Sequence, residues 1–136
     1  MTNEFQITNK RTQKQNFDLE ERTLRFTKNC INICKLMPLN TINGVIIKQL
    51  LRAASSVGAN YREANDSITK KEFYHRIGTC RKEAKESKYW LELLEHANNK
   101  YSAEASSLID EAFQLVRIFA SISSHSKALS NLKFDI

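Results

Sequence analysis

The most reactive side chains in this 136-residue chain belong to three histidines and three cysteines. His75, His96 and His125 lie on three separate stretches, and none has a nucleophile or carboxylate at a spacing that indicates a proton relay. Glu92 and His96 are four residues apart and could bind a metal, but this spacing more often marks a surface pair. The sequence contains no HExxH motif and only one Glu-x-x-His motif, Glu72–His75, whereas a helix-bundle di-iron site needs two. We therefore expect no catalytic residue, no metal site and no cofactor, and predict that the protein is not an enzyme.

The cysteines Cys30, Cys34 and Cys80 all fall on apolar stripes of predicted helices. Cys30 and Cys34 have i,i+4 spacing, but no histidine or third cysteine lies nearby at ligand spacing. Buried free thiols acting as small hydrophobic residues explain them better than a metal site does. Reduced thiols are typical of the cytoplasm. The sequence also contains no apolar run that predicts a membrane span and no secretory signal, so we expect a cytoplasmic protein with no membrane partner.

The net charge of +6 is unevenly distributed. Residues 70–88 contain seven basic and three acidic residues, a local charge of +4, whereas residues 101–126 contain one basic and three acidic residues, or −2. Four cations of the basic segment share a sector of roughly 60° beside the apolar stripe of their helix. Such a face either binds a phosphate backbone or is a solvated surface whose charges pair with Glu83 and Glu86. The candidate nucleic-acid-binding residues are Lys48, Arg52, Arg62, Lys70, Arg81, Lys85 and Lys88.

Amphipathic helices must carry these residues, because apolar residues recur every three or four positions across residues 17–126. Helices are predicted from near Asp18 to Pro38, from Asn40 or Thr41 to about 65, from a Thr69 cap to about 97, and from Ser102 to 126. The predicted fold class is all-α, an antiparallel up-down-up-down four-helix bundle. Residues 1–16 are expected to form a flexible N-terminal arm, residues 17–126 the bundle and residues 127–136 a C-terminal tail.

The third and fourth predicted helices carry more apolar surface than a single stripe requires. An unusually wide core would explain this, but burial against another chain is our preferred interpretation. The candidate oligomer-interface residues are Tyr89, Trp90, Leu93, Ile109, Phe113 and Val116. A different feature of the second helix is Gly58, which stands among small residues without a GxxxxGK pattern. We expect close approach of a neighbouring helix there rather than phosphate binding.

The stretches LLRAASSVGANYREA (Leu50–Ala64) and KEAKESKYWLELL (Lys82–Leu94) resemble the bacterial four-helix-bundle family of ribosomal-RNA intervening-sequence proteins. The resemblance covers about residues 17–126, although a glycine frequent in the family motif is Ala64 here. It implies a homopentamer and a relationship to the accessory variability proteins of diversity-generating retroelements, which contact nucleic acid and a reverse transcriptase. Arg52 or Arg62 is expected to pair with Glu83 or Glu86 on the facing helix and so fix the register. The polar positions that match the family motif are Arg52, Asn60, Glu63, Glu83 and Glu86.

Two functions from different classes fit these features. The first is a non-enzymatic, oligomeric scaffold that binds RNA or DNA through a basic surface without strong sequence preference. The alternative is a protein-interaction subunit, for example an accessory subunit of a retroelement reverse transcriptase, in which basic charge steers the partner. A carrier of a small ligand has less support, because ordinary aliphatic residues fill the core stripes. Binding that weakens steeply with salt would favour the first function over the second.

Overall fold

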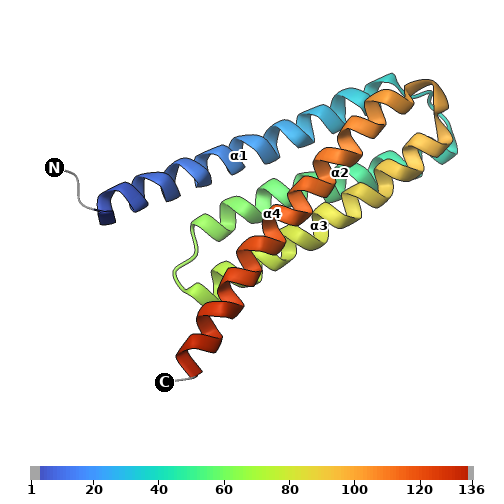
Figure 1. The fold of residues 1–136 in the computed structure, drawn as a ribbon. Helices are drawn as coiled ribbons and strands as arrows, with labels where there is room; N and C mark the ends of the chain where they lie inside the picture. The colour runs from blue at the N-terminus through green and yellow to red at the C-terminus, as the bar shows by residue number, and fades with distance from the viewer. Residues whose placement is uncertain (1–3, 135–136) are drawn as a thin grey trace.

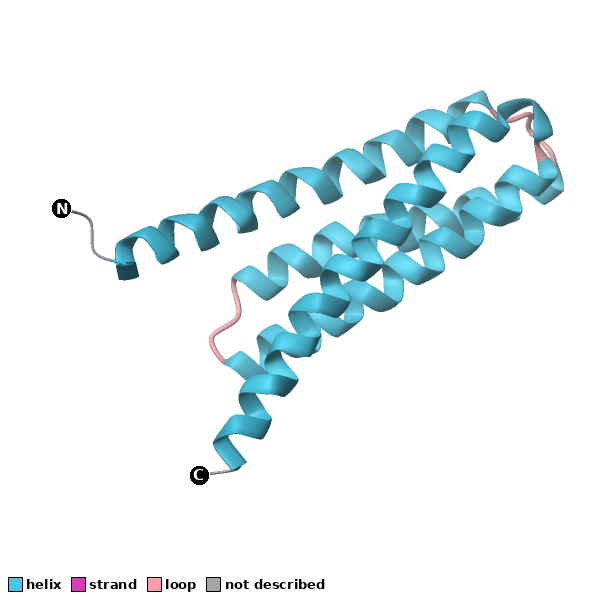
Figure 2. Ribbon diagram, viewed as in Figure 1, coloured by secondary structure: helices cyan, strands magenta, loops and turns pink. Residues whose placement is uncertain are grey.

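A computed structural model describes the backbone of residues 4–134 and the side chains of residues 19–124. Four long helices pack along one another, as Figure 1 shows, and only short connections join them, as Figure 2 shows. Within residues 4–134 there is no strand, so the prediction of an all-helical protein built from four helices is confirmed. The elements are α1 (Glu4–Leu36), α2 (Thr41–Asn65), α3 (Lys70–Ala97), the 3-10 turn η1 (Asn99–Tyr101) and α4 (Ser102–Phe134).

Side-chain caps begin α2 and α3 where the sequence predicted them. The Asn40 carboxamide oxygen accepts a hydrogen bond of 2.8 Å from the Asn43 backbone N–H, which begins α2. The Thr69 hydroxyl accepts one of 3.1 Å from the Glu72 N–H, which begins α3. Each cap satisfies a backbone donor that the first turn of a helix leaves without an intrahelical partner.

The core consists of one apolar stripe from each helix, with Phe26, Tyr61 and Phe119 among its largest fully buried side chains. The buried polar residues Thr23, Asn43 and Ser87 are each hydrogen-bonded through their side chains, which offsets their desolvation. The amides of Asn43 and Asn98 donate to each other, at 3.1 and 2.9 Å, and thereby join the start of α2 to the end of α3. This amide pair fixes the register of the two helices at one end of the bundle.

Gly58 marks a close approach between α1 and α2, as the sequence predicted. A Cβ atom at position 58 would lie 3.2 Å from the Thr23 hydroxyl oxygen. Nearby, the Thr27 hydroxyl donates a hydrogen bond of 2.9 Å to the Ala54 carbonyl. The small residues of α2 thus allow α1 to pack against it almost backbone to backbone.

Helices α1 and α4 are longer than predicted. Residues 4–16, expected as a flexible arm, belong to α1, and residues 127–134 of the expected tail belong to α4. The prediction stopped where the apolar stripe fades, but neither helix contains a proline or glycine that would interrupt its backbone hydrogen bonds. Residues 1–3 and 135–136 of the expected arm and tail lie outside the described residues.

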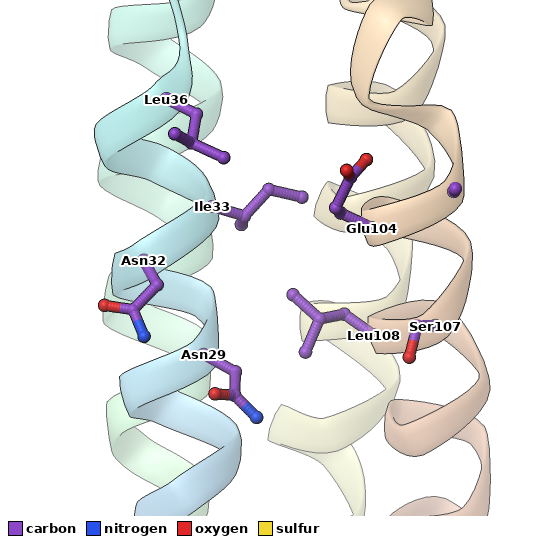
Figure 3. A pocket seen from close by; sticks show the side chains of 8 residues that line it. Asn29, Asn32, Ile33, Leu36, Glu104, Ser107 and Leu108 are labelled. Carbon is purple, nitrogen blue, oxygen red and sulfur yellow. The ribbon is translucent and has the colours of Figure 1, made fainter.

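Helix α1 packs mainly on α2 and more lightly on α4. Helices α1 and α4 are joined by Arg22 of α1, whose guanidinium donates to both carboxylate oxygens of Glu111 on α4, at 2.9 and 2.6 Å. Toward the other end they leave a hollow of about 460 Å³, into which Ile33 and Leu108 project from opposite sides (Figure 3). Among the described residues, no helix has an apolar stretch long enough to cross a membrane.

Candidate nucleic-acid interface

Arg52 forms an ion-pair network between α2 and α3. Its guanidinium lies 3.3 Å from a carboxylate oxygen of Glu83 and also pairs with Glu86. The Gln49 side-chain oxygen accepts a further hydrogen bond from Arg52, at 3.2 Å. Of the arginine–glutamate pairings left open by the sequence, the structure therefore selects Arg52, which engages both acids. The Arg52 side chain is 47% exposed, and its charge is shared between these two acids at the surface of the α2–α3 contact.

A second group of cations on α3 has no such partners. Arg81, Lys82 and Lys85 are exposed, and together with Gly78 they line a surface hollow of about 310 Å³. Among the described side chains, none of the three cations forms an ion pair. We call Arg81, Lys82 and Lys85 the α3 basic row. Because Gly78 has no side chain, the cations border an open depression rather than a filled surface.

Lys82 was not among the predicted binding residues, although the sequence contains its signal. It directly follows Arg81 and precedes Lys85 by three residues, so it shares the same exposed side of the helix. Of the remaining predicted residues, Lys88 pairs with Glu92 at 2.5 Å. Lys48, Arg62 and Lys70 are exposed and make no ion pair with any described side chain.

The other polar residues of the family motif have different environments. The Asn60 side-chain oxygen accepts a hydrogen bond of 3.1 Å from Arg76, so this residue also links α2 to α3. Glu63 is exposed on α2 and makes no ion pair with a described side chain. Thus the motif residues Arg52, Asn60, Glu83 and Glu86 join α2 to α3, whereas Glu63 does not.

Comparison with known proteins gives the same family as these motif residues. The family model of the 23S rRNA-intervening sequence protein matches residues 15–121. The chain belongs to the 23S rRNA-intervening sequence protein family. A similar solved structure is a protein of unknown function from the S23 ribosomal protein family of Bacteroides thetaiotaomicron. It is 28% identical, has a TM-score of 0.67, and the match covers 77% of this chain and 97% of that one. No curated protein matches the chain.

In this member of the family, the six predicted interface residues divide into two groups. Tyr89 is 55% exposed and Phe113 is 46% exposed, with the Arg117 guanidinium 5.8 Å from the centre of the Phe113 ring. The other four are partly buried and pack against the core cluster: Trp90, Leu93, Ile109 and Val116. These four widen the core within one chain, whereas Tyr89 and Phe113 keep large apolar surfaces in solvent.

The thiols of this family member have environments that disfavour reactivity. Burial raises the pKa of Cys80 to about 12 and that of Cys34 to about 11, and it also raises the pKa of Cys30. Their thiols therefore stay protonated near neutral pH, the form that is a poor nucleophile and a poor metal ligand. Within the described residues no group of three potential metal ligands occurs. His75 and His96 are exposed, and the side chain of His125 lies outside the described residues.

Proposed function

We propose that this protein is a non-enzymatic scaffold subunit that binds the phosphate backbone of RNA or DNA through the α3 basic row. The observation that carries this proposal is the exposure of Arg81, Lys82 and Lys85 around one hollow, without an acidic partner among the described side chains. Lysine and arginine contacts to phosphates supply most of the affinity in binding that does not depend on base sequence. Three adjacent cations on one helix suit successive phosphates better than a single small anion.

The network around Arg52 supports this function, because it occupies the acids closest in sequence to the row. Glu83 and Glu86 lie on the same helix as the row, but both pair with Arg52 across the α2–α3 contact. Glu92 is likewise paired with Lys88. The positive charge of the row is therefore left for a polyanion.

The oligomeric part of the proposal is an assembly of up-down-up-down antiparallel bundles, with a homopentamer as the expected form and the cytoplasm as its location. Support comes from the exposed side chains of Tyr89 and Phe113, since large apolar residues in solvent commonly mark contacts between chains. Repetition of the α3 basic row around a ring would let one nucleic acid contact several subunits. Such multivalency raises the overall affinity without any new type of contact.

Fluorescence anisotropy with a labelled RNA hairpin and a DNA duplex of similar length, over a salt series, tests this function. Arg81→Glu with Lys85→Glu should reduce affinity at low salt at least tenfold and lower the steepness of the salt dependence, since about one counterion is released per phosphate contact. The matched control, Lys48→Glu with Arg62→Glu, makes the same charge change on α2 and should lose less. Unchanged affinity of the α3 variant, with its oligomeric mass preserved, would contradict the proposal.

A second candidate function is a protein-interaction subunit, such as an accessory subunit of a retroelement reverse transcriptase. It is favoured by exposed apolar residues that lie outside the basic row, notably Ile42 and Val45 on α2, at 66% and 58% exposure. Apolar contacts with a protein partner would persist at moderate salt, whereas phosphate contacts would not. Two results together would favour this alternative. The protein would fail to bind nucleic acid even at low salt, and it would capture a purified reverse transcriptase at moderate salt.

A further inference from the structure

Tyr89 is the most exposed aromatic residue among the described side chains, at 55%, and it continues the α3 basic row along the helix. It follows Lys82 by seven residues and Lys85 by four, and in an α-helix these three residues lie within about 60° of one another. Gly78, which opens the hollow bordered by the cations, lies in the same sector of α3. The ring is therefore attached about 6 Å along the helix from Lys85, on the side where the hollow opens.

The Tyr89 ring is supported by Trp90 and keeps a free face. The centres of the two rings are 5.3 Å apart and their planes are inclined by 72°, an edge-to-face contact that covers at most one face of either ring. Trp90 is itself partly buried against the core, so it restricts the movement of the Tyr89 ring. By contrast, the Arg117 guanidinium lies over the exposed ring of Phe113. Among the described side chains, no cation lies over the ring of Tyr89.

A free aromatic face beside a group of cations suits one class of nucleic acid in particular. Proteins that bind single strands combine basic residues, which contact the phosphates, with aromatic rings on which unpaired bases stack. In a duplex the faces of each base are covered by its neighbours, so a ring on the surface of a protein helix has no base to stack on. The cations of α3 would serve either form of nucleic acid, whereas the free face of Tyr89 would serve only unpaired bases.

We propose that the α3 basic row and Tyr89 together bind an unpaired segment of RNA or DNA, with one base stacked on the Tyr89 ring. The phosphates next to that base would lie toward Lys82 and Lys85, in the hollow beside Gly78. This inference rests on the proposed function and adds to it the class of nucleic acid that is bound. With Tyr89 used in this way, Phe113 on α4 carries the support for assembly.

The acids nearest to Tyr89 in sequence do not oppose this contact. Glu86 precedes it by three residues and pairs with Arg52, and Glu92 follows it by three residues and pairs with Lys88. Arg52 and residues 81–92 together contain five basic and three acidic residues, a net charge of +2. A strand whose base reaches the ring therefore meets a surface of positive net charge.

Fluorescence anisotropy at low salt tests the stacking contact with three labelled probes of equal length: an unstructured single strand, the same strand without its bases, and a duplex. The unmodified protein should bind the intact strand about tenfold more tightly than the abasic strand, because only the intact strand offers a base to the ring. Tyr89→Ala should remove this difference by weakening the intact strand alone. The strands are made both as RNA and as DNA; both should show the loss, and the one bound more tightly identifies the preferred nucleic acid.

Two variants and a salt series control this measurement. Tyr89→Phe keeps a ring and should retain the affinity for the intact strand. Phe113→Ala removes the other exposed ring, on α4, and should also retain it. Because Tyr89 carries no charge, Tyr89→Ala should leave the steepness of the salt dependence unchanged, whereas Arg81→Glu with Lys85→Glu should lower it for all probes.

The possible results separate this inference from the broader function. Equal affinity of the unmodified protein for the intact and the abasic strand would overturn base stacking without any substitution. It would also be overturned if Tyr89→Ala weakened strand and duplex alike, or lowered the oligomeric mass in light scattering, since Tyr89 would then act in the fold or between copies. In each case the phosphate-binding function would stand if Arg81→Glu with Lys85→Glu still weakened every probe. If no probe bound at low salt, the proposed function and this inference would fail together.

Discussion

Arg52 and Arg81 differ in their partners, which gives a test in which the two arginines should behave in opposite ways. Replacing Arg52 by Met keeps much of the aliphatic stem but removes the ion pairs to Glu83 and Glu86. The Arg52 side chain is 47% exposed, and Glu83 and Glu86 are 14% and 36% exposed, so solvent partly screens the pairs. Exposed pairs contribute up to about 1 kcal/mol each, so we expect a loss of about 1–2 kcal/mol of unfolding free energy. For a domain of this size that corresponds to a decrease in Tm of roughly 4–8 °C.

Arg81→Met is the matched control, because it makes the same change at an exposed position that has no ion pair within the described part of the chain. Its unfolding free energy should change by less than about 0.5 kcal/mol. Its affinity for RNA or DNA should fall several-fold, while Arg52→Met should lose about twofold at most. Urea unfolding and anisotropy on the same preparations measure both quantities. If Arg52→Met left stability unchanged and reduced nucleic-acid affinity as much as Arg81→Met, our assignment of Arg52 to the bundle would be refuted.

Three further predictions concern the packing of the bundle. Gly78→Ala should raise the unfolding free energy by about 0.5–1 kcal/mol in urea titrations, because a Cβ atom at position 78 meets no other atom within 4 Å. Gly58→Ala should give no such gain, because its Cβ atom would lie 3.2 Å from the Thr23 hydroxyl oxygen. Asn43→Leu should lower the Tm measurably, because it removes the reciprocal amide bonds and leaves the Asn98 carboxamide oxygen without its donor, at a cost of about 1–3 kcal/mol. An unchanged Tm would contradict a stabilising role of the Asn43–Asn98 amide pair. The folded-state pKa values of Cys34 and Cys80, about 11 and 12, exceed the ordinary value of 9.0, so the unfolded chain releases these protons first. The contribution of these two thiols to the free energy of unfolding should therefore be constant up to about pH 9 and fall between pH 9 and 12, and Cys80→Ala should make the fall shallower by at most about 1.4 kcal/mol per pH unit.

The fold could be predicted from the sequence because the signals for it are local. The apolar stripe reports which side of each helix is buried, and Asn40, Thr69 and Asn98 mark the helix ends through hydrogen bonds to their neighbours in sequence. Gly58 was informative for a related reason. A glycine inside a helix lowers helix stability, so its presence indicates a packing requirement.

The surface was harder to predict, because it depends on which charges meet across helices. Lys85 and Lys88 both belong to the basic segment of α3, yet Lys88 is paired with Glu92 whereas Lys85 has no ion pair with a described side chain. Trp90 and Leu93 lie away from the main apolar stripe and are nevertheless partly buried, since the α2–α3 contact extends the core outward. The periodicity of a single helix does not show which charges pair or which apolar residues are covered by a neighbouring helix.

The pairing of Arg52 also couples the fold to the proposed binding surface, and this coupling can be measured. Without Arg52, Glu86 would be free to pair with Lys82, four residues earlier on the same helix. Such a pair is worth about 0.2–0.5 kcal/mol, which corresponds to about a twofold loss of nucleic-acid affinity. Adding Glu86→Gln to Arg52→Met should therefore restore the affinity but not the lost stability. If the double variant bound no better than Arg52→Met alone in anisotropy at low salt, Glu86 would have no part in keeping the α3 basic row unpaired.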